Sequence, residues 1–199
     1  MDEDVYYRIE KEGTGLYKEK MSRFLSFALK IENAEEAKQF VKMYQNEYHD
    51  SRHVCWAFLI GPKGEEWQLN DNGEPSGTAG KPILGQIRSF GVTDVLVIVV
   101  RYFGGIKLGT PGLIAAYREA AREALENSGK KECYETEEIT IEFSYISADG
   151  VMKLVKSKEI EVKERQFDNV CKMVIVVRKS EADEIRGKLK KVEGVQILA

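Results

Sequence analysis

Two glycine-rich segments carry the side chains that are best able to do chemistry. The first runs from Gly73 to Pro82 and, with Asp71 just ahead of it, offers two carboxylates, Asp71 and Glu74. Carboxylates this close together could hold a hard cation or serve as acid and base. A turn of glycine and proline can also use carboxylates as acceptors for backbone N–H groups, and this structural role is the favoured interpretation. Asp71 and Glu74 are the only candidates for catalysis, and no metal site is predicted.

The second segment, from Gly104 to Gly112, predicts a binding site for an anion. Thr110 and Pro111 predict the start of a helix, with Thr110 as its N-cap. Unpaired N–H groups at a helix start are electropositive and favour a phosphate or carboxylate. The predicted anion- or RNA-binding residues are Lys81, Arg101, Gly104, Gly105, Lys107, Thr110 and Gly112. Alternatively, the glycines only allow a sharp turn from strand to helix.

Neither segment matches a nucleotide-binding fingerprint. The GxxxxGK[ST] and GxGxxG patterns are both absent, so no ATP, NAD or other cofactor is expected. His49 and His53 are the only histidines, and because a helix should end near His49, their spacing does not predict zinc. His53 and Cys55 would project from one face of a strand, as a base and a nucleophile would. The sequence shows no third group to orient them, and Cys55 is expected to be a small buried apolar residue.

The composition is that of a globular protein with one locally basic region. The chain has 199 residues, of which 43% are hydrophobic and 32% charged. Its net charge of −3 gives no overall attraction for nucleic acid, and DNA is not an expected partner. Between Pro75 and Arg118, however, five residues are Lys or Arg and only Asp94 is acidic. This excess favours an anionic partner, although ordinary solvated surface charge is an alternative.

The expected compartment is the cytoplasm. Cys55, Cys133 and Cys171 are odd in number and lack zinc-ligand spacing, so they are interpreted as reduced thiols. The acidic start from Met1 to Asp4 does not resemble a secretory signal. No apolar run is long enough to span a membrane, and no membrane partner is expected. The oligomeric state is not predicted.

The elements that must position the two segments predict an α+β chain of two domains. Strands are predicted at 6–9, 24–31, 54–60, 66–69 and 94–102, and helices at 34–48, 83–90 and 110–127. Asn33 is expected to cap the first helix, with Glu36 as its partner. From Thr136 the order is strand, helix, two strands, helix, strand, the ferredoxin-like βαββαβ pattern. Residues 130–135 are expected to be a linker between domains at 1–131 and 136–199.

Several motifs resemble those of the IMPACT/YigZ family. They are Ser22-Arg23-Phe24, His53-x-Cys55-x-Ala57, the run from Asp71 to Pro82 and the run from Arg101 to Gly109. The resemblance implies a bacterial two-domain member. Its N-terminal domain would be like domain 2 of ribosomal protein S5, and its ferredoxin-like C-terminal domain like domain V of elongation factor G. Eukaryotic relatives regulate translation through a partner of a stress kinase, so the resemblance also implies a role in translation.

Three residues depart from the family pattern. Asn72 stands where a second Asp is usual, Pro111 replaces a Gly, and Ala115 replaces an Arg. The missing Arg removes a cation close to the predicted anion site. Lys107 and Arg101 would then have to attract the anion.

The expected function is that of a non-enzymatic, translation-associated regulator. It would bind RNA, the ribosome or a translation factor through the basic face of the glycine-rich segments. The alternative is a hydrolase or transferase that acts on an anionic small molecule in the cleft between the segments, with Asp71 or Glu74 as base. A third interpretation is protein binding through the uncovered sheet face of the C-terminal domain.

Overall fold

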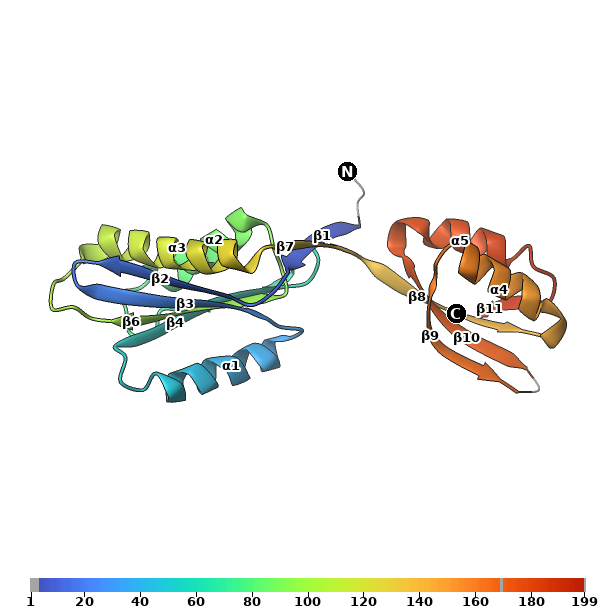
Figure 1. Ribbon diagram of the computed structural model, residues 1–199, viewed down its shortest axis with the longest axis horizontal. Coiled ribbons are helices and arrows are strands. Elements are labelled where there is room, and N and C mark those ends of the chain that lie inside the picture. The colour runs from blue at the N-terminus through green and yellow to red at the C-terminus, as the bar shows by residue number, and fades with distance from the viewer. Residues whose placement is uncertain (1–3, 169, 199) are drawn as a thin grey trace. The chain divides into compact units, whose positions relative to one another are not determined.

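The computed structural model describes residues 4–168 and 170–198 and divides them into two compact units. One is Tyr6–Cys133, here called the N-terminal unit; the other, the C-terminal unit, contains residues 134–198 with Asp4 and Val5. Figure 1 shows the elements of each unit. Residues 1–3, 169 and 199 lie outside the description, and with them the outermost residues of the two predicted domains. In the described chain, no helix is both long and apolar enough to cross a membrane.

A five-stranded antiparallel sheet is the framework of the N-terminal unit, in the order β2-β3-β6-β4-β5. Its strands are β2 (Gly13–Glu19), β3 (Ser22–Lys30), β4 (His53–Ile60), β5 (Glu66–Asn70) and β6 (Val95–Tyr102). Helix α1 (Ala34–Glu47) lies on one face of the sheet (Figure 1). Helices α2 (Gly80–Phe90) and α3 (Gly109–Ser128) lie on the other. The two glycine-rich segments thus precede α2 and α3 on the same face.

Strand β6 is apolar throughout because helices cover it on both sides. The odd-numbered residues from Val95 to Val99 belong to the cluster that packs with α2 and α3. The even-numbered residues from Leu96 to Val100 belong to the cluster that packs with α1. All six are 0% exposed, so the predicted strand with two covered faces is confirmed.

Helix α3 lies unusually close to the sheet because its buried stripe is rich in alanine. Ala116, Ala120 and Ala124 are 0% exposed. The neighbouring strand β2 carries Gly13, where an added Cβ would lie 2.1 Å from the carbonyl oxygen of Ala124. Only glycine fits at that distance. Strand β2 was not predicted, because its two glycines and its charged residues give it little apolar pattern.

The C-terminal unit contains a second antiparallel sheet, in the order β11-β8-β10-β9. Its elements are β8 (Thr136–Phe143), α4 (Ala148–Ser157), β9 (Glu161–Phe167), β10 (Cys171–Arg178), α5 (Ala182–Leu189) and β11 (Val195–Leu198). Short 3-10 turns, Tyr145–Ser147 and Lys179–Glu181, precede the two helices. The core combines apolar residues of β8 and β10 with Val151, Ile185 and Leu189 of the helices. The predicted order of strands and helices is therefore present.

The segment expected to be a linker contains a strand. Residues Lys130–Tyr134 form β7, which pairs with β1 (Val5–Ile9) in a two-stranded ribbon. Most of β7 is exposed and charged, which is why its sequence resembles a loop. Its pairing depends on the backbone of β1 rather than on an apolar face, so periodicity could not reveal it.

The carboxylate of Asp4 is held by side chains of the C-terminal unit. It accepts hydrogen bonds from Arg178 Nη2 at 3.0 Å and from the Ser180 hydroxyl at 2.6 Å. These donors hold the pKa of Asp4 far below its usual value, with the Arg178 hydrogen bond as the largest cause.

Candidate functional site

A pocket of about 430 Å³ lies between the two glycine-rich segments. The start of β4, the first segment, the end of β6 and the start of α3 provide its lining. Glu74 and Arg101 are buried in its wall, whereas Phe103 and Lys107 are exposed. This pocket occupies the place where the sequence predicted a cleft.

Asp71 holds the first segment together and is not among the pocket residues. Its carboxylate accepts N–H bonds from Gly77 at 2.8 Å, Ala79 at 3.0 Å and Gly80 at 2.8 Å. These amides close the loop and include unpaired donors at the start of α2, where a negative charge is also favoured by the helix dipole. The hydrogen bonds support the structural role and leave Asp71 badly placed to act as a base in the pocket.

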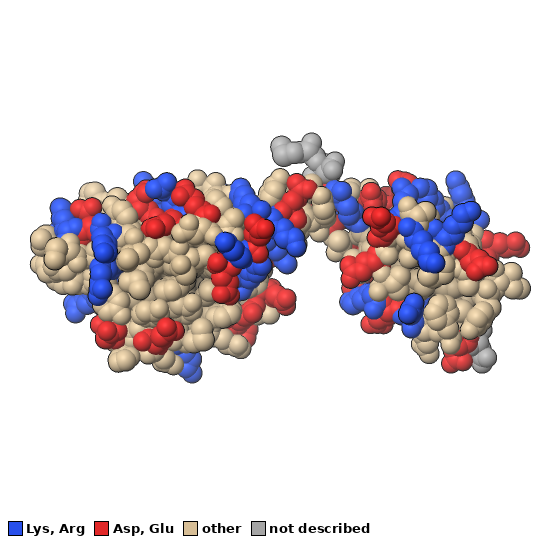
Figure 2. All heavy atoms as spheres, viewed as in Figure 1, with Lys and Arg blue, Asp and Glu red and all other residues tan. Residues whose placement is uncertain are grey.

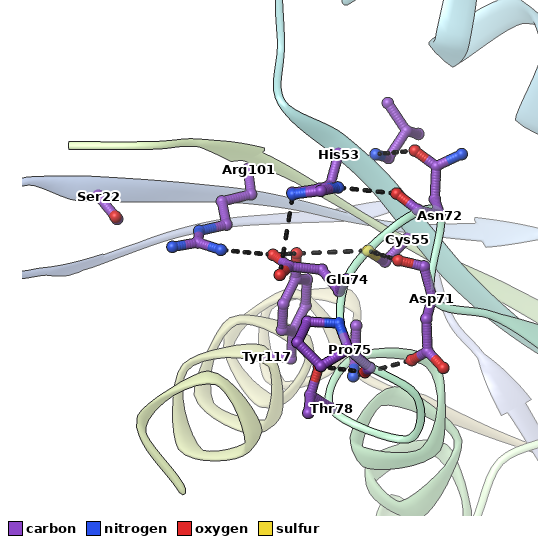
Figure 3. Close-up of polar contacts among 12 residues, drawn as sticks. Ser22, His53, Cys55, Asp71, Asn72, Glu74, Pro75, Thr78, Arg101 and Tyr117 are labelled. Atoms are coloured by element: carbon purple, nitrogen blue, oxygen red, sulfur yellow. Dashed lines mark hydrogen bonds and ion pairs between the residues drawn. The ribbon is translucent and has the colours of Figure 1, made fainter. Parts of the chain in front are cut away.

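Glu74 is the buried acidic group of the site. Its Oε1 accepts hydrogen bonds from Arg101 Nη1 at 2.6 Å and from the Tyr117 hydroxyl at 2.8 Å (Figure 3). The side chain of Glu74 is 3% exposed and that of Arg101 is 6% exposed. Burying an ion pair has a large desolvation cost, which such short hydrogen bonds offset only in part. Both bonds fall on Oε1, and Oε2 is left to face His53.

His53 is oriented by a backbone carbonyl. Its Nδ1 lies 2.7 Å from the carbonyl oxygen of Asn72, and its Nε2 lies 3.8 Å from Glu74 Oε2 (Figure 3). A carbonyl oxygen can only accept, so Nδ1 carries the hydrogen. When the ring is neutral, Nε2 is an acceptor. Sequence reasoning found no group to orient His53, because the partner is a main-chain atom whose position depends on the loop.

Asn72 also fixes the loop through its side chain. Its Oδ1 accepts the N–H of Val54 at 2.8 Å, and its backbone has a φ of +42°. Asparagine tolerates this left-handed conformation better than most residues do. The side-chain oxygen of Asn72 thus secures the loop to β4, a role that an Asp carboxylate could also fill, so the structure does not explain this departure from the family pattern.

Cys55 and Tyr117 lie beneath the pocket as a buried polar pair. The Cys55 Sγ lies 3.0 Å from the Asp71 carbonyl oxygen and 3.3 Å from the Tyr117 hydroxyl. Burial raises the pKa of the Cys55 thiol far above its ordinary value, so the thiolate needed for nucleophilic attack is not formed at neutral pH. Burial also raises the pKa of Tyr117, which stays a neutral donor to Glu74. The prediction that Cys55 is buried is confirmed.

Arg101 is held by aromatic rings as well as by Glu74. Its guanidinium carbon lies 5.5 Å from the ring centres of both Phe24 and Phe103. Phe24 in turn packs edge-on against Tyr117, with ring centres 5.2 Å apart. Within the described chain, the buried Arg101 Nε has no hydrogen-bond partner. The site thus contains a buried donor that the protein itself does not satisfy.

The second glycine-rich segment is anchored to the turn between β2 and β3. The N–H of Gly104 donates to the Ser22 hydroxyl at 3.2 Å. A Cβ at Gly104 would lie 2.1 Å from the carbonyl carbon of Met21, so a side chain there would displace the backbone. Gly104 is therefore required by this close approach, and it fixes Phe103 beside the pocket.

Helix α3 begins differently from the prediction. Its first residue is Gly109, its N-cap is Leu108, and no side chain caps it, so Thr110 is not the N-cap. Gly109 has a φ of +70°, and the N-cap lies two residues earlier than predicted, at Leu108 instead of Thr110. In such a helix the N–H of Gly112 bonds to the Leu108 carbonyl, and Pro111 has no N–H. The N–H groups of Gly109 and Thr110 have no carbonyl partner within the helix and can donate to an anion.

Positive charge at the pocket comes from three side chains, Arg52, Arg101 and Lys107. In the described part of the chain, Arg52 and Lys107 form no ion pair. Glu74 is the single carboxylate at the pocket and already pairs with Arg101. Elsewhere Lys and Arg are interspersed with Asp and Glu on the visible face of each unit (Figure 2). The pocket lining itself thus has an excess of positive charge.

The structure brings together only part of the predicted set. Arg101, Lys107 and Thr110 line the pocket with Glu74, whereas Lys81, Gly104, Gly105 and Gly112 do not. Arg52 and His53 also line the pocket, although Arg52 was not predicted at all. Its position just before β4 gave no signal beyond its charge. It is placed by its own backbone N–H, which bonds to the Arg101 carbonyl at 2.9 Å.

Comparisons with known proteins agree on one family. Residues 20–125 match the model of the Impact N-terminal domain. The IMPACT family member YigZ of Escherichia coli (strain K12) is 38% identical over 138 residues, 68% of each chain. A crystal structure of a hypothetical protein is 30% identical, covers 98% of this chain and 97% of its own, and has a TM-score of 0.74.

A second solved structure is less similar to this chain. The solved structure of the two-domain translational regulator Yih1 is 25% identical, covers 62% of this chain and 47% of its own, and has a TM-score of 0.37. The family-model match and the identity to the curated bacterial relative decide the assignment. This chain belongs to the IMPACT family.

Proposed function

We propose that the protein is a non-enzymatic regulator of translation that binds an anionic group of RNA or of the ribosome in the pocket. The observation that carries the proposal is the charge of the pocket wall. Three cationic side chains accompany one carboxylate, and that carboxylate is already paired. Membership of the IMPACT family supports a role in the regulation of translation. A translation factor is the other partner that the family resemblance allows.

Arg52 and Lys107 are the groups that would attract the anion. Both are exposed, line the pocket and lack an intramolecular ion pair among the described residues, so binding an anion breaks no existing ion pair. The amides of Gly109 and Thr110 add two donors with the positive end of the α3 dipole. Arg101 contributes from the wall, where its charge is largely offset by Glu74.

We also infer the finer fold of each unit. The N-terminal unit is assigned the fold of domain 2 of ribosomal protein S5. The C-terminal unit is assigned the ferredoxin-like fold of elongation factor G domain V, which its element order and strand order support. In translational GTPases this pair of folds contacts the ribosome, which fits the proposed partner.

Binding to ribosomes and to single-stranded RNA, measured between about 50 and 200 mM salt, tests the proposal. Two phosphate contacts predict that log K falls with log[salt] with a slope of about −1.4. A Lys107→Ala/Arg52→Ala variant should bind weakly and lose most of that slope. Lys38→Ala is the matched control, because Lys38 is exposed on α1, on the opposite sheet face.

Two results would refute this reading. Absence of affinity for ribosomes and RNA at low salt would remove the nucleic-acid proposal, and recovery of a translation factor instead would favour the other partner. Equal loss of binding in the Lys38→Ala control and the pocket variant would show that the pocket is not the site.

A second candidate is a hydrolase or transferase that acts on an anionic small molecule. The arrangement that favours it is His53 Nε2, a fixed acceptor 3.8 Å from a buried carboxylate in a cationic pocket. Turnover of phosphate esters that disappears in His53→Ala, but persists in Lys38→Ala, would establish this candidate. Binding without turnover supports the non-enzymatic proposal.

A further inference from the structure

Two hydrogen-bond acceptors in the pocket wall receive no hydrogen bond from the described residues. They are Nε2 of the neutral His53 ring and Oε2 of Glu74, which lie 3.8 Å apart and, because both accept, cannot hydrogen-bond to each other. The other atom of each group is already engaged: Nδ1 by the Asn72 carbonyl, and Oε1 by Arg101 and Tyr117. The two free atoms therefore cannot turn away without breaking three short contacts.

Two fixed acceptors at this separation match two neighbouring hydroxyl donors. Hydroxyl hydrogen bonds are about 2.7–2.8 Å long, so a vicinal diol can donate one hydrogen to each acceptor. A phosphate cannot make this contact, because it has no donor when fully ionised and is repelled by the carboxylate. Glu74 therefore suits the hydroxyl groups of a ligand, whereas Lys107 attracts its phosphate.

The exposed lining suits the remaining parts of a nucleotide. Lys107 and the amides of Gly109 and Thr110 are donors for a phosphate. Phe103 is 48% exposed, and its ring offers a face for a base. The volume of about 430 Å³ lies within the range of pockets for small ligands.

We infer that the pocket recognises the 2′,3′-diol of a ribonucleotide, with that nucleotide's phosphate at Lys107 and its base against Phe103. The inference rests on the proposed function and narrows it from any anion to one with a free ribose diol. Such a diol occurs at the 3′ end of an RNA chain and in a free nucleoside 5′-monophosphate. DNA lacks the 2′-hydroxyl and is discriminated against for that reason.

Wild-type protein and a set of short oligonucleotides test the inference without any risk of misfolding. The set is one RNA with a 3′-hydroxyl end, the same RNA with a 3′-terminal 2′-deoxynucleotide, and the same RNA with a 3′-phosphate. The two altered ends should bind about ten- to a hundredfold more weakly, because each leaves a fixed acceptor unpaired. Equal affinity for all three overturns the inference but leaves the proposed function standing. No binding to any of them overturns the inference, and the measurement with ribosomes then decides the proposed function.

A fourth arm, adenosine 5′-monophosphate, separates the two sources of the diol. Affinity equal to that of the RNA identifies the free nucleotide as sufficient, whereas much weaker binding identifies the RNA end. Both outcomes support the inference provided that 2′-deoxyadenosine 5′-monophosphate binds more weakly.

His53 and Arg52, which are adjacent in the sequence and both line the pocket, provide a matched pair of variants. His53→Ala removes one acceptor and should reduce the preference for the diol end to below about threefold. Arg52→Ala removes a cation from the same pocket and should weaken binding to every oligonucleotide by a similar factor, with the preference unchanged. If His53→Ala keeps the full preference, His53 does not read the ribose and the inference fails.

Discussion

Replacing Arg101 with methionine should destabilise the N-terminal unit by about 3–5 kcal/mol. The side chain of Glu74 is 3% exposed, and Arg101 Nη1 donates to it at 2.6 Å. Methionine fills a similar length but removes this charge, so the carboxylate is left buried with only the Tyr117 hydroxyl as a direct donor. The size of the loss is set by the desolvated, unpaired charge rather than by the missing hydrogen bond alone.

Tryptophan fluorescence can follow this unit without interference from the other. The chain has two tryptophans, Trp56 and Trp67, and both lie in the N-terminal unit. Urea titration of the wild type and the variant should show a lower midpoint with an unchanged slope. At roughly 4 °C per kcal/mol for a unit of this size, the thermal midpoint should fall by about 12–20 °C.

The surface of α3 offers a matched control. Arg122 pairs with Glu119 and Glu126 through the same chemistry, but its side chain is 52% exposed. Solvent screens such pairs, so Arg122→Met should lower the free energy of unfolding far less than Arg101→Met does. If Arg101→Met costs no more than Arg122→Met, the buried pair is not what its geometry indicates and the reasoning fails.

Four further changes test other parts of the site and fold. Tyr117→Phe keeps the ring and removes a hydroxyl that donates to Glu74 at 2.8 Å, so urea titration should show a loss of about 1.5–3 kcal/mol. Gly104→Ala should lower the thermal midpoint and weaken RNA binding, because its Cβ would lie 2.1 Å from backbone. Gly85→Ala on α2 meets nothing within 4 Å and should stabilise by up to about 1 kcal/mol. Asp4, whose pKa is depressed by its donors, adds stability above a pH of about 4 that is lost as the pH falls further. Asp4→Asn should flatten the acid dependence of C-terminal unit unfolding, measured by hydrogen exchange of β10, and an unchanged dependence would rule out this role.

Short-range patterns in the sequence were sufficient for most of the fold. Asn33 was predicted to cap α1, and its Oδ1 accepts the Glu36 N–H at 2.9 Å. The apolar run of β6 and the alanine stripe of α3 can each be recognised within one short stretch of the sequence. Their contacts follow from the periodicity of strand and helix. Strands β2 and β7 were missed because glycine or charge replaces the apolar alternation in them.

The site could be predicted only where it depends on residue type. Glu74, Arg101 and Lys107 were identified from their charge and their place in the glycine-rich segments. The acceptor role of His53 was not, because its orienting partner is a carbonyl 19 residues away. The start of α3 was misplaced because the left-handed conformation of Gly109 is a property of the folded loop. Main-chain atoms, which carry no residue signature, account for both errors.

The buried pair of Glu74 and Arg101 is better explained by recognition than by stability. Well-packed hydrophobic residues of similar volume often match or exceed a buried ion pair in stability. Hydrophobic residues at both positions should therefore recover much of the stability that Arg101→Met alone loses. They would remove Oε2, however, and with it the second of the two acceptors that face the pocket. A double variant that folds well and still prefers the ribose diol would separate the ion pair from recognition; a stable variant without that preference is the expected result.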